Sequence, residues 1–501
     1  MGTIRIVIAL YMIIVLLIGF YAMKRTKDSS DFYAAGKSLG ILSVAMASFS
    51  AAISGYVFVG GPGLFYNLGM GTLWMTFPTS ISFAMCWIIM SKRMRLLAET
   101  HNCITTPDAI YARYKSNRTR LISAIATMVG LLLYLATQIS ALGFIISPIF
   151  GISFKTSVIV GMIIVIIYSA AGGMLAGVYT DVFQGGMMAV ASIFILIFAV
   201  KAGNGMPNMS TVIAGAVKGG AKISNPWGVI PAALAIGWFF CLSIGIVGQP
   251  HIVHKFYMIK DINKLKWGPF IGAIPAMLGG LFWITIGMCI KYLSVSGKLS
   301  PESAALLASN KDNAVVVFLN NYAPKVIAGM VYAGIVSAVM STADSFINIV
   351  SACIVKDIPA AQGKQLTPKQ ELFYGRISVV ILAILTIIIS FTVGQSGVAV
   401  LGAFGWGTFA AALAPALGIG LNWKRATEKA AYWSIVVGLV GNVTLEIGNK
   451  LHMAWYANSL GKLGIYNGTF MMVISTIVFI IVSYATSQQV IDKGVEAAME
   501  A

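Results

Sequence analysis

Apolar stretches of roughly membrane-spanning length follow one another along nearly the whole chain, about thirteen of them at about twenty residues each. In a bilayer only a helix or a closed barrel satisfies its own backbone hydrogen bonds, and stretches of this length indicate helices. Composition agrees, because 58% of the 501 residues are hydrophobic and only 10% are charged. We therefore predict an all-α polytopic membrane protein, with one transmembrane domain over residues 1–501. The expected spans are 4–22, 40–61, 72–91, 119–149, 154–173, 180–202, 228–249, 267–293, 325–355, 372–394, 397–422, 430–449 and 468–486.

Basic residues predict how these helices are oriented. The first stretch precedes Lys24, Arg25 and Lys27, and its apolar core is too long for a signal peptide, so we interpret it as a retained helix. With the N-terminus outside, most of the 34 Lys and Arg residues, Lys37 and Lys255 among them, fall in inner loops. We expect a plasma-membrane protein, N-terminus outside and C-terminus cytoplasmic. We then interpret the net charge of +18 as the excess of Lys and Arg that marks the inner loops of a membrane protein, and we expect no nucleic-acid partner.

Two predicted helices contain weak points. In the second span, Gly55 and the run Gly60-Gly61-Pro62-Gly63 are poor helix formers, which predicts an unwound segment over 50–63. The seventh span has Gly237, Gly245 and then Gly248-Gln249-Pro250. Paired broken helices supply backbone carbonyls and helix ends for ligands at the midplane of inverted-repeat transporters. The alternative is that these glycines only allow close helix packing.

Polar side chains at membrane depth concentrate in residues 338–345, Ala-Val-Met-Ser-Thr-Ala-Asp-Ser. Ser341, Thr342 and Asp344 need partners there, because a polar group in hydrocarbon finds no water. Oxygen ligands suit a hard cation such as Na⁺. The alternative is that each hydroxyl bonds to the carbonyl one turn earlier in its own helix.

Asp181 and Asp344 are the two acids with the strongest functional case. Asp181 opens the expected sixth span, so it is either an N-terminal cap or a functional carboxylate. Asp344 lies two residues beyond Thr342 and points about 200° away from it on a helix. We expect Asp344 to face the protein interior and to support a second cation or a polar network.

With these residues the chain resembles the sodium/solute symporter family, which includes sodium/proline, pantothenate, monocarboxylate and sugar symporters. The resemblance rests on Ser50–Gly63, Gly172–Asp181, Gly248–His251 and Ala338–Thr342, in that order. It implies a five-plus-five inverted-repeat fold like that of the leucine transporter. The extra N-terminal helix would be 4–22, the repeats about 40–202 and 228–422, and two C-terminal helices would occupy 430–486.

The resemblance also implies a sodium site between the second and ninth spans. Its ligands would be the carbonyl oxygens of Ser50, Ile53 and Ala338 and the hydroxyls of Ser341 and Thr342. Asp181 resembles a family aspartate linked to sodium coupling. One position departs from the pattern: sodium/proline symporters carry an aspartate where this chain has Ala52, which argues against proline transport of the usual kind.

We therefore expect a sodium-coupled symporter that imports a small polar, carboxylate-bearing organic solute, such as pantothenate, a monocarboxylate or an amino acid such as proline. Na⁺ would be the co-transported ion, and the lipid bilayer and the solute the other partners. Alternatives are a proton-coupled carrier or a transporter-like membrane sensor. The four histidines lack catalytic or metal-ligand spacing, so no enzyme is expected. The candidate solute-lining residues are Tyr56, Phe58, Trp238, Phe239 and Gln249.

Overall fold

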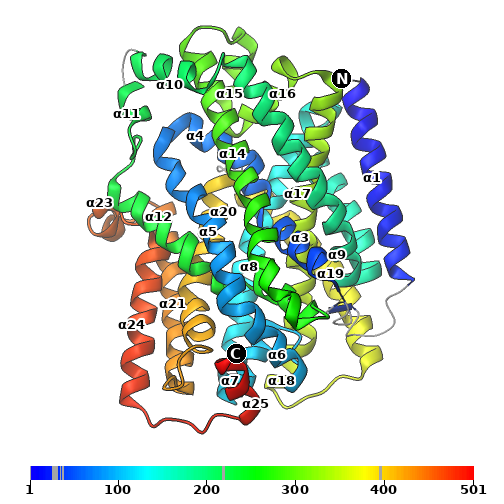
Figure 1. The fold of residues 1–501 in the computed structure, drawn as a ribbon, viewed down its shortest axis with the longest axis vertical. Coiled ribbons are helices and arrows are strands. Elements are labelled where there is room, and N and C mark those ends of the chain that lie inside the picture. Colours follow the sequence, from blue (N-terminus) through cyan, green and yellow to red (C-terminus); the bar gives the residue numbers. More distant parts are fainter. Residues whose placement is uncertain (1, 25–31, 34, 36–38, 217–219, 394–397) are drawn as a thin grey trace.

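The computed structural model describes residues 2–24, 32–33, 35, 39–216, 220–393 and 398–501. Helices are the only regular secondary structure of these residues, and their one extended pairing is an isolated bridge between Leu39 and Ile259. The N-terminus lies near one end of the long axis, and the C-terminus lies in the opposite half of the molecule (Figure 1). Arg25, Lys27 and Lys37, which the sequence assigns to the first inner loop, lie outside the described residues.

The helices vary widely in length. In chain order the α-helices are α1 (Gly2–Met23), α3 (Ile41–Ala52), α4 (Gly61–Leu68), α5 (Leu73–Cys86), α6 (Lys92–Thr100), α7 (Thr106–Tyr114), α8 (Asn117–Phe150), α9 (Phe154–Ala202), α10 (Met206–Gly215), α11 (Gly220–Ser224), α12 (Ala232–Ile244), α13 (Pro250–Val253), α14 (Gly268–Val295), α15 (Pro301–Ser309), α16 (Ala314–Tyr322), α17 (Lys325–Ala352), α18 (Ile358–Ala361), α19 (Pro368–Val393), α20 (Val398–Ala412), α21 (Glu428–Lys450), α22 (Ala454–Ala457), α23 (Leu460–Leu463), α24 (Asn467–Ala485) and α25 (Lys493–Glu500). Short π- and 3₁₀-helical segments join several of them: Tyr56–Gly60, Gly69–Thr72, Trp87–Ser91, Gly245–Gly248, His254–Met258, Ile262–Trp267, Lys311–Asn313, Cys353–Asp357 and Ala414–Ile419.

Nine helical segments of the described chain are long and apolar enough to cross a membrane. A tenth span results if Ala232–Gly248 and Pro250–Met258, which are bent by 47°, are taken as one. The number is lower than the expected thirteen because some expected spans appear in the described chain only as shorter apolar helices, such as Ile41–Ala52 and Phe154–Ile167. The second, for example, contributes only the short helix α3 and a separate segment that runs on from Tyr56.

The expected fifth and sixth spans are two helices that meet at Gly173 within α9, without the loop that the sequence prediction placed between them. Gly173 has non-helical geometry, at φ 55° and ψ −145°, so the second helix begins earlier than the expected residue 180. Glycine adopts this left-handed region without strain, and a Cβ here would also overlap the carbonyl of Phe32. The chain therefore turns at one residue. Asp181 lies eight residues further on, inside the helix, so it is not an N-terminal cap.

The run from Gly60 to Gly63 is helical rather than unwound, a second correction. Gly60 ends a π-helical turn and the other three residues begin α4, with Pro62 in its first turn. A Cβ on Gly61 would overlap the ring of Trp283, and one on Gly63 would overlap the backbone of Lys311. These glycines serve close packing, as the alternative interpretation proposed. The break in the second span is confined to the residues around Ile53 and Ser54.

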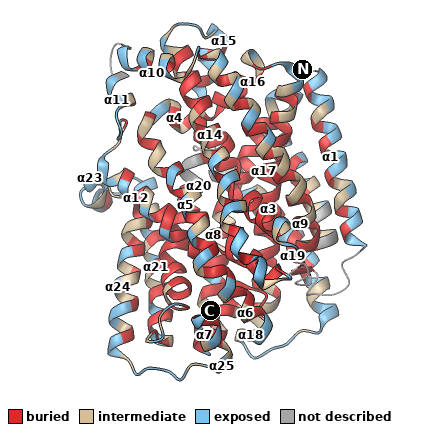
Figure 2. Ribbon diagram, viewed as in Figure 1, coloured by how far each residue is buried: buried red, intermediate tan, exposed pale blue. Residues whose placement is uncertain are grey.

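Helix α17 lies at the centre of the bundle. Every residue from Val331 to Ala352 is buried, and the helix packs against α9, α8, α1 and α3. Helix α1 forms one flank, while α21 and α24 pack together on the other side beside α20 (Figure 1). Buried residues fill the middle of the bundle, and exposed ones dominate the outer helices (Figure 2). Exposed apolar side chains there, such as Ile88 and Leu17, suit contact with lipid.

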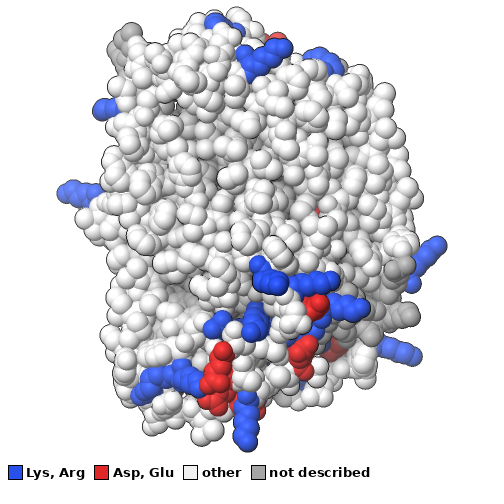
Figure 3. Space-filling model, in the orientation of Figure 1, with Lys and Arg blue, Asp and Glu red and all other residues white. Residues whose placement is uncertain are grey.

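The segments that join the long helices at the end near the N-terminus carry the short helices α10, α11, α15 and α16 (Figure 1). At the start of α15 the Ser300 side chain accepts a hydrogen bond from the backbone N–H of Ser303, and Pro301 occupies the first turn, which is the local pattern of a helix start. Charged side chains gather mainly toward the end of the molecule where the C-terminus lies, whereas the middle band of this face is almost free of them (Figure 3).

Asp312, in the short turn before α16, gives a prediction about pH. Its carboxylate accepts a hydrogen bond from the N–H of Val398 at 2.8 Å, and burial raises its pKa to about 6. The native state then binds this proton more tightly than the unfolded chain, so stability should fall as pH rises from about 4 to 6. Asp312→Asn should remove this part of the pH dependence and stabilise the purified protein at pH 7 by on the order of 2 kcal/mol. Unfolding curves at pH 4.5 and 7 check this, and an unchanged difference between them would contradict it.

Candidate cation and solute site

The second span breaks where α3 ends. Ile53 has extended geometry, at φ −87° and ψ 95°, and helical geometry resumes at Gly55. A side chain from α8 satisfies the freed backbone: the N–H of Gly55 donates to Gln138 Oε1 at 3.0 Å. Gln138 Nε2 lies 3.3 Å from Ser54 Oγ, and this hydroxyl accepts from the N–H of Tyr56. One buried glutamine side chain therefore bonds both to a backbone N–H and to a hydroxyl at the break.

The seventh span breaks at Gln249. Between the 3₁₀ turn Gly245–Gly248 and α13, this residue has extended geometry, at φ −81° and ψ 106°. Its Nε2 donates to the carbonyls of Gly245 at 3.2 Å and Trp406 at 3.1 Å. Its Oε1 is buried without a hydrogen-bond partner. Helix α13 packs against α3 and α17, so the two broken helices meet in the centre of the bundle.

Beside the first break, three helices contribute oxygen atoms to one buried cluster. Ser50 Oγ on α3 donates to Ser341 Oγ on α17 at 2.8 Å, and Ser341 Oγ donates in turn to a carboxylate oxygen of Asp181 on α9. Thr342 Oγ1 is 2.9 Å from the Ala338 carbonyl and 3.2 Å from that of Ala51. All of these residues are buried. Without an ion, the Thr342 hydroxyl back-bonds within its helix, as the alternative interpretation described.

Asp181 has a partner that the sequence analysis did not identify as part of the site. Lys255 Nζ lies 2.8 Å from Asp181 Oδ2, and both side chains are completely buried. From the sequence, Lys255 counted as one of the loop charges that report topology. The one local signal against that interpretation was the apolar run Phe256-Tyr257-Met258-Ile259 directly after it, which is buried in the structure.

Asp344 lies one turn beyond Ser341 on α17, also facing α9, and has hydrogen-bond partners of its own. Its Oδ1 accepts a hydrogen bond from Asn348 Nδ2 at 2.9 Å, and Asn348 Nδ2 also donates to Ser169 Oγ at 3.1 Å. Helix α9 approaches the carboxylate so closely that a Cβ on Gly177 would overlap Asp344 Oδ2. Asp344 is therefore buried between α17 and α9, whereas Ser341 bonds to Asp181.

The candidate solute residues do not form one group. Trp238 lines a cavity of about 370 Å³ together with Tyr456 and Tyr466. Tyr56 packs edge-on against Trp283, with ring centroids 5.4 Å apart. Phe58 packs against Phe282 and Phe239 against Trp74 and Phe240, contacts that are ordinary helix packing.

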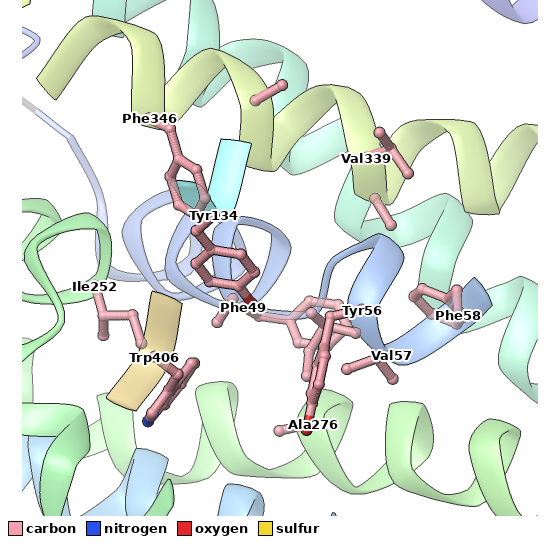
Figure 4. Packing of buried hydrophobic residues seen from close by; sticks show 14 of the residues in the cluster. Phe49, Tyr56, Val57, Phe58, Tyr134, Ile252, Ala276, Val339, Phe346 and Trp406 are labelled. Carbon is pink, nitrogen blue, oxygen red and sulfur yellow. The ribbon is translucent and has the colours of Figure 1, made fainter. Parts of the chain in front are cut away.

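Aromatic residues that the sequence analysis did not select lie between the two breaks. Tyr134 OH is 3.4 Å from Ser54 Oγ, and its ring contacts Phe346 (Figure 4). His251 is buried against Tyr134, Phe346 and Trp406, and neither of its ring nitrogens has a hydrogen-bond partner. His251 was part of a recognised motif, but α8 and α20 offer no local pattern that would have marked Tyr134 or Trp406.

A bundle of apolar helices, two of them broken beside a buried cluster of oxygen atoms, is the arrangement of a secondary transporter. The model of the sodium:solute symporter family matches residues 32–438, and the chain belongs to this family. It is accordingly a membrane transporter and not an enzyme. Among the described residues, no group of three or more His, Cys, Asp or Glu side chains could hold a metal ion.

Relatives match over nearly the full chain. The osmoregulated proline transporter OpuE of Bacillus subtilis is 27% identical, covering 97% of this chain and 96% of that protein. A sodium/proline symporter of Staphylococcus aureus is 26% identical, covering 96% and 92%. Among solved structures, a substrate-bound, outward-open Na⁺-coupled sialic acid symporter superposes with a TM-score of 0.77 at 18% identity, covering 97% of this chain and 98% of the other. That likeness shows the fold.

Proposed function

We propose that this chain is a Na⁺-driven symporter that imports a small carboxylate-bearing solute across the plasma membrane. The observation that carries the proposal is the buried oxygen cluster in which Ser50, Ser341 and Asp181 join α3, α17 and α9. Hydroxyls and a carboxylate from three helices are the ligand chemistry of a hard cation. A cation held there would join helices that must move relative to each other during transport.

The proposed Na⁺ ligands are the hydroxyls of Ser341 and Thr342 and the carbonyls of Ser50, Ile53 and Ala338. Support comes from the position of Thr342, whose hydroxyl reaches both its own helix and the carbonyl of Ala51 on α3. Na⁺ would replace such hydroxyl–carbonyl hydrogen bonds with direct coordination. The Ala51 carbonyl is a further candidate ligand.

The proposed solute site lies between the two breaks. Gly55 N–H, at the start of a helical segment, is bonded to the neutral amide oxygen of Gln138. A carboxylate is a stronger acceptor and is favoured at a helix N-terminus. Tyr134, His251 and Trp406 supply aromatic surface, and Gln249 Oε1 and both His251 nitrogens are polar atoms without partners. These groups would suit a small solute with both apolar and polar parts.

The proposed topology is two inverted five-helix repeats, about 40–202 and 228–422, within thirteen helices. The N-terminus would be outside and the C-terminus inside. This agrees with termini in opposite halves of the molecule and with the concentration of charged residues in the half that contains the C-terminus.

Uptake by whole cells tests the proposal. Cells that lack their own carriers would receive labelled proline, pantothenate, lactate or sialic acid, with Na⁺ or K⁺ outside and with or without a protonophore. We expect uptake of at least one carboxylate only with Na⁺. Uptake that ignores Na⁺ but stops with the protonophore would show a proton-coupled carrier, and no transport of any carboxylate by correctly inserted protein would contradict the solute class.

Asp344→Asn provides a second test. The substitution keeps the size of the side chain and a hydrogen bond to Asn348 but deletes the charge. We expect transport to fall several-fold while Na⁺ still binds, because Asp344 is outside the proposed ligand set. Binding of ²²Na⁺ to purified protein, alongside uptake, separates the two effects. Loss of all Na⁺ binding in a folded variant would move Asp344 into the coordination sphere.

A further inference from the structure

The ion pair between Lys255 and Asp181 is the starting observation. Its atoms are 2.8 Å apart and both side chains have no exposed surface. An ammonium ion loses most of its hydration when it is buried this deeply, and only a paired opposite charge makes that tolerable. The other polar-atom contact of Lys255 Nζ is the thioether sulfur of Met174, at 3.7 Å. Asp181 therefore supplies the charge that neutralises Lys255.

Asp181 is also hydrogen-bonded to Ser341, one of the proposed Na⁺ ligands. One carboxylate oxygen holds the Lys255 ammonium, and the other accepts the hydrogen bond of Ser341. One carboxylate neutralises one positive charge. A Na⁺ ion next to Ser341 would therefore meet a carboxylate whose charge is already balanced, and it would be repelled by the ammonium on the far side.

Lys255 is attached to a part of the chain that a transporter would move. It lies in the 3₁₀ segment His254–Met258, directly after α13, at the C-terminal end of the broken seventh span, which the proposed topology places inside. This segment packs against α3 and α6. Release of Lys255 from Asp181 would detach the inner half of one broken helix from α9.

We infer that the Lys255 ammonium is a tethered cation that occupies Asp181 when Na⁺ is absent and that Na⁺ displaces it. The inference rests on the proposed function, because it assumes the Na⁺ site beside Ser341. It adds a role for Lys255. Na⁺ and the Lys255 ammonium compete for Asp181, so binding of Na⁺ also changes the position of the half-helix that carries Lys255. Such a competition couples a site to a conformational equilibrium.

Equilibrium binding of ²²Na⁺ to the purified full-length protein in lipid nanodiscs tests this without knowing the solute. Lys255→Gln removes the competing charge but can still donate a hydrogen bond to Asp181, so the carboxylate is not left unpartnered. We expect Na⁺ to bind about tenfold more tightly, equivalent to about 1.4 kcal/mol. Lys424→Gln is the matched control, because Lys424 pairs with Glu496 and Glu500 at the surface, and it should leave Na⁺ binding unchanged.

Lys255→Arg tests the opposite direction and keeps the pair intact. A guanidinium can bind a carboxylate through two parallel hydrogen bonds. It should therefore compete with Na⁺ for Asp181 more strongly than an ammonium does and weaken Na⁺ binding several-fold. A folded Gln variant with unchanged or weaker Na⁺ binding would overturn the inference. If that variant does not fold, Na⁺ binding to the Arg variant that equals or exceeds the wild-type affinity would do so. Absence of Na⁺ binding to the wild-type protein would instead contradict the proposed function itself.

Discussion

Replacing both Ser341 and Thr342 with alanine is expected to raise the Na⁺ concentration for half-maximal transport by at least about tenfold, and each single change by less. A hydrogen bond or ligand contact to a charged group contributes about 1.5–3 kcal/mol, and 1.4 kcal/mol corresponds to tenfold in affinity. Both hydroxyls are buried at the meeting of α17 with α3, and each bonds to the opposite helix or to Asp181. Their loss removes two of the proposed ligands with little change in packing volume.

Two other hydroxyls serve as controls for this prediction. Ser140 Oγ and Thr180 Oγ1 are buried but bond to carbonyls of their own helices, at 2.9 Å for Ser140 and at 3.1 and 2.8 Å for Thr180. Ser140→Ala and Thr180→Ala should therefore leave the Na⁺ dependence of uptake unchanged. Wild-type Na⁺ dependence in the Ser341→Ala, Thr342→Ala double variant, at normal surface expression, would rule out the assigned cation site.

Asp181→Asn is expected to cause the largest loss of stability among the site variants. The change deletes the charge that neutralises Lys255 and leaves a buried ammonium without a counter-ion. Breaking a buried pair from one side costs about 3–5 kcal/mol. Na⁺ affinity should fall as well, because the amide cannot balance a cation next to Ser341. Thermal unfolding of purified protein, with and without Na⁺, measures both effects.

A second variant separates the stability effect from the binding effect. Asp181→Asn combined with Lys255→Gln replaces the ion pair by two neutral amides, which can bond to each other. Most of the lost stability should return, whereas Na⁺ should no longer stabilise the protein. If Asp181→Asn alone were as stable as the wild type, the Lys255 pairing would be unimportant for the fold. Full Na⁺ stabilisation of the double variant would show that Asp181 does not serve the ion.

Much of the fold follows from local sequence. Apolar length predicts the membrane helices, and Ser300-Pro301 predicts the start of α15, because both signals act within one segment. The seventh span breaks at Gly248-Gln249-Pro250, where the sequence is weakest. The octet 338–345 also identified a helical stretch, 331–352, whose polar side chains are all buried, since hydroxyls and a carboxylate at membrane depth need partners inside the protein.

Only the tertiary structure showed the roles of the glycine run in the second span and of the buried charges Asp181 and Lys255. Gly60 to Gly63 resemble a break in isolation, but Trp283 and the Lys311 backbone pack so closely there that glycine is needed within regular helix. Asp181 resembled a helix start because hydropathy falls before it, whereas the second helix of α9 begins earlier, at the kink at Gly173. Lys255 resembled a loop charge, yet it meets Asp181 across 74 residues of sequence. Pattern and composition describe one segment at a time, whereas a buried ion pair depends on which helices pack together.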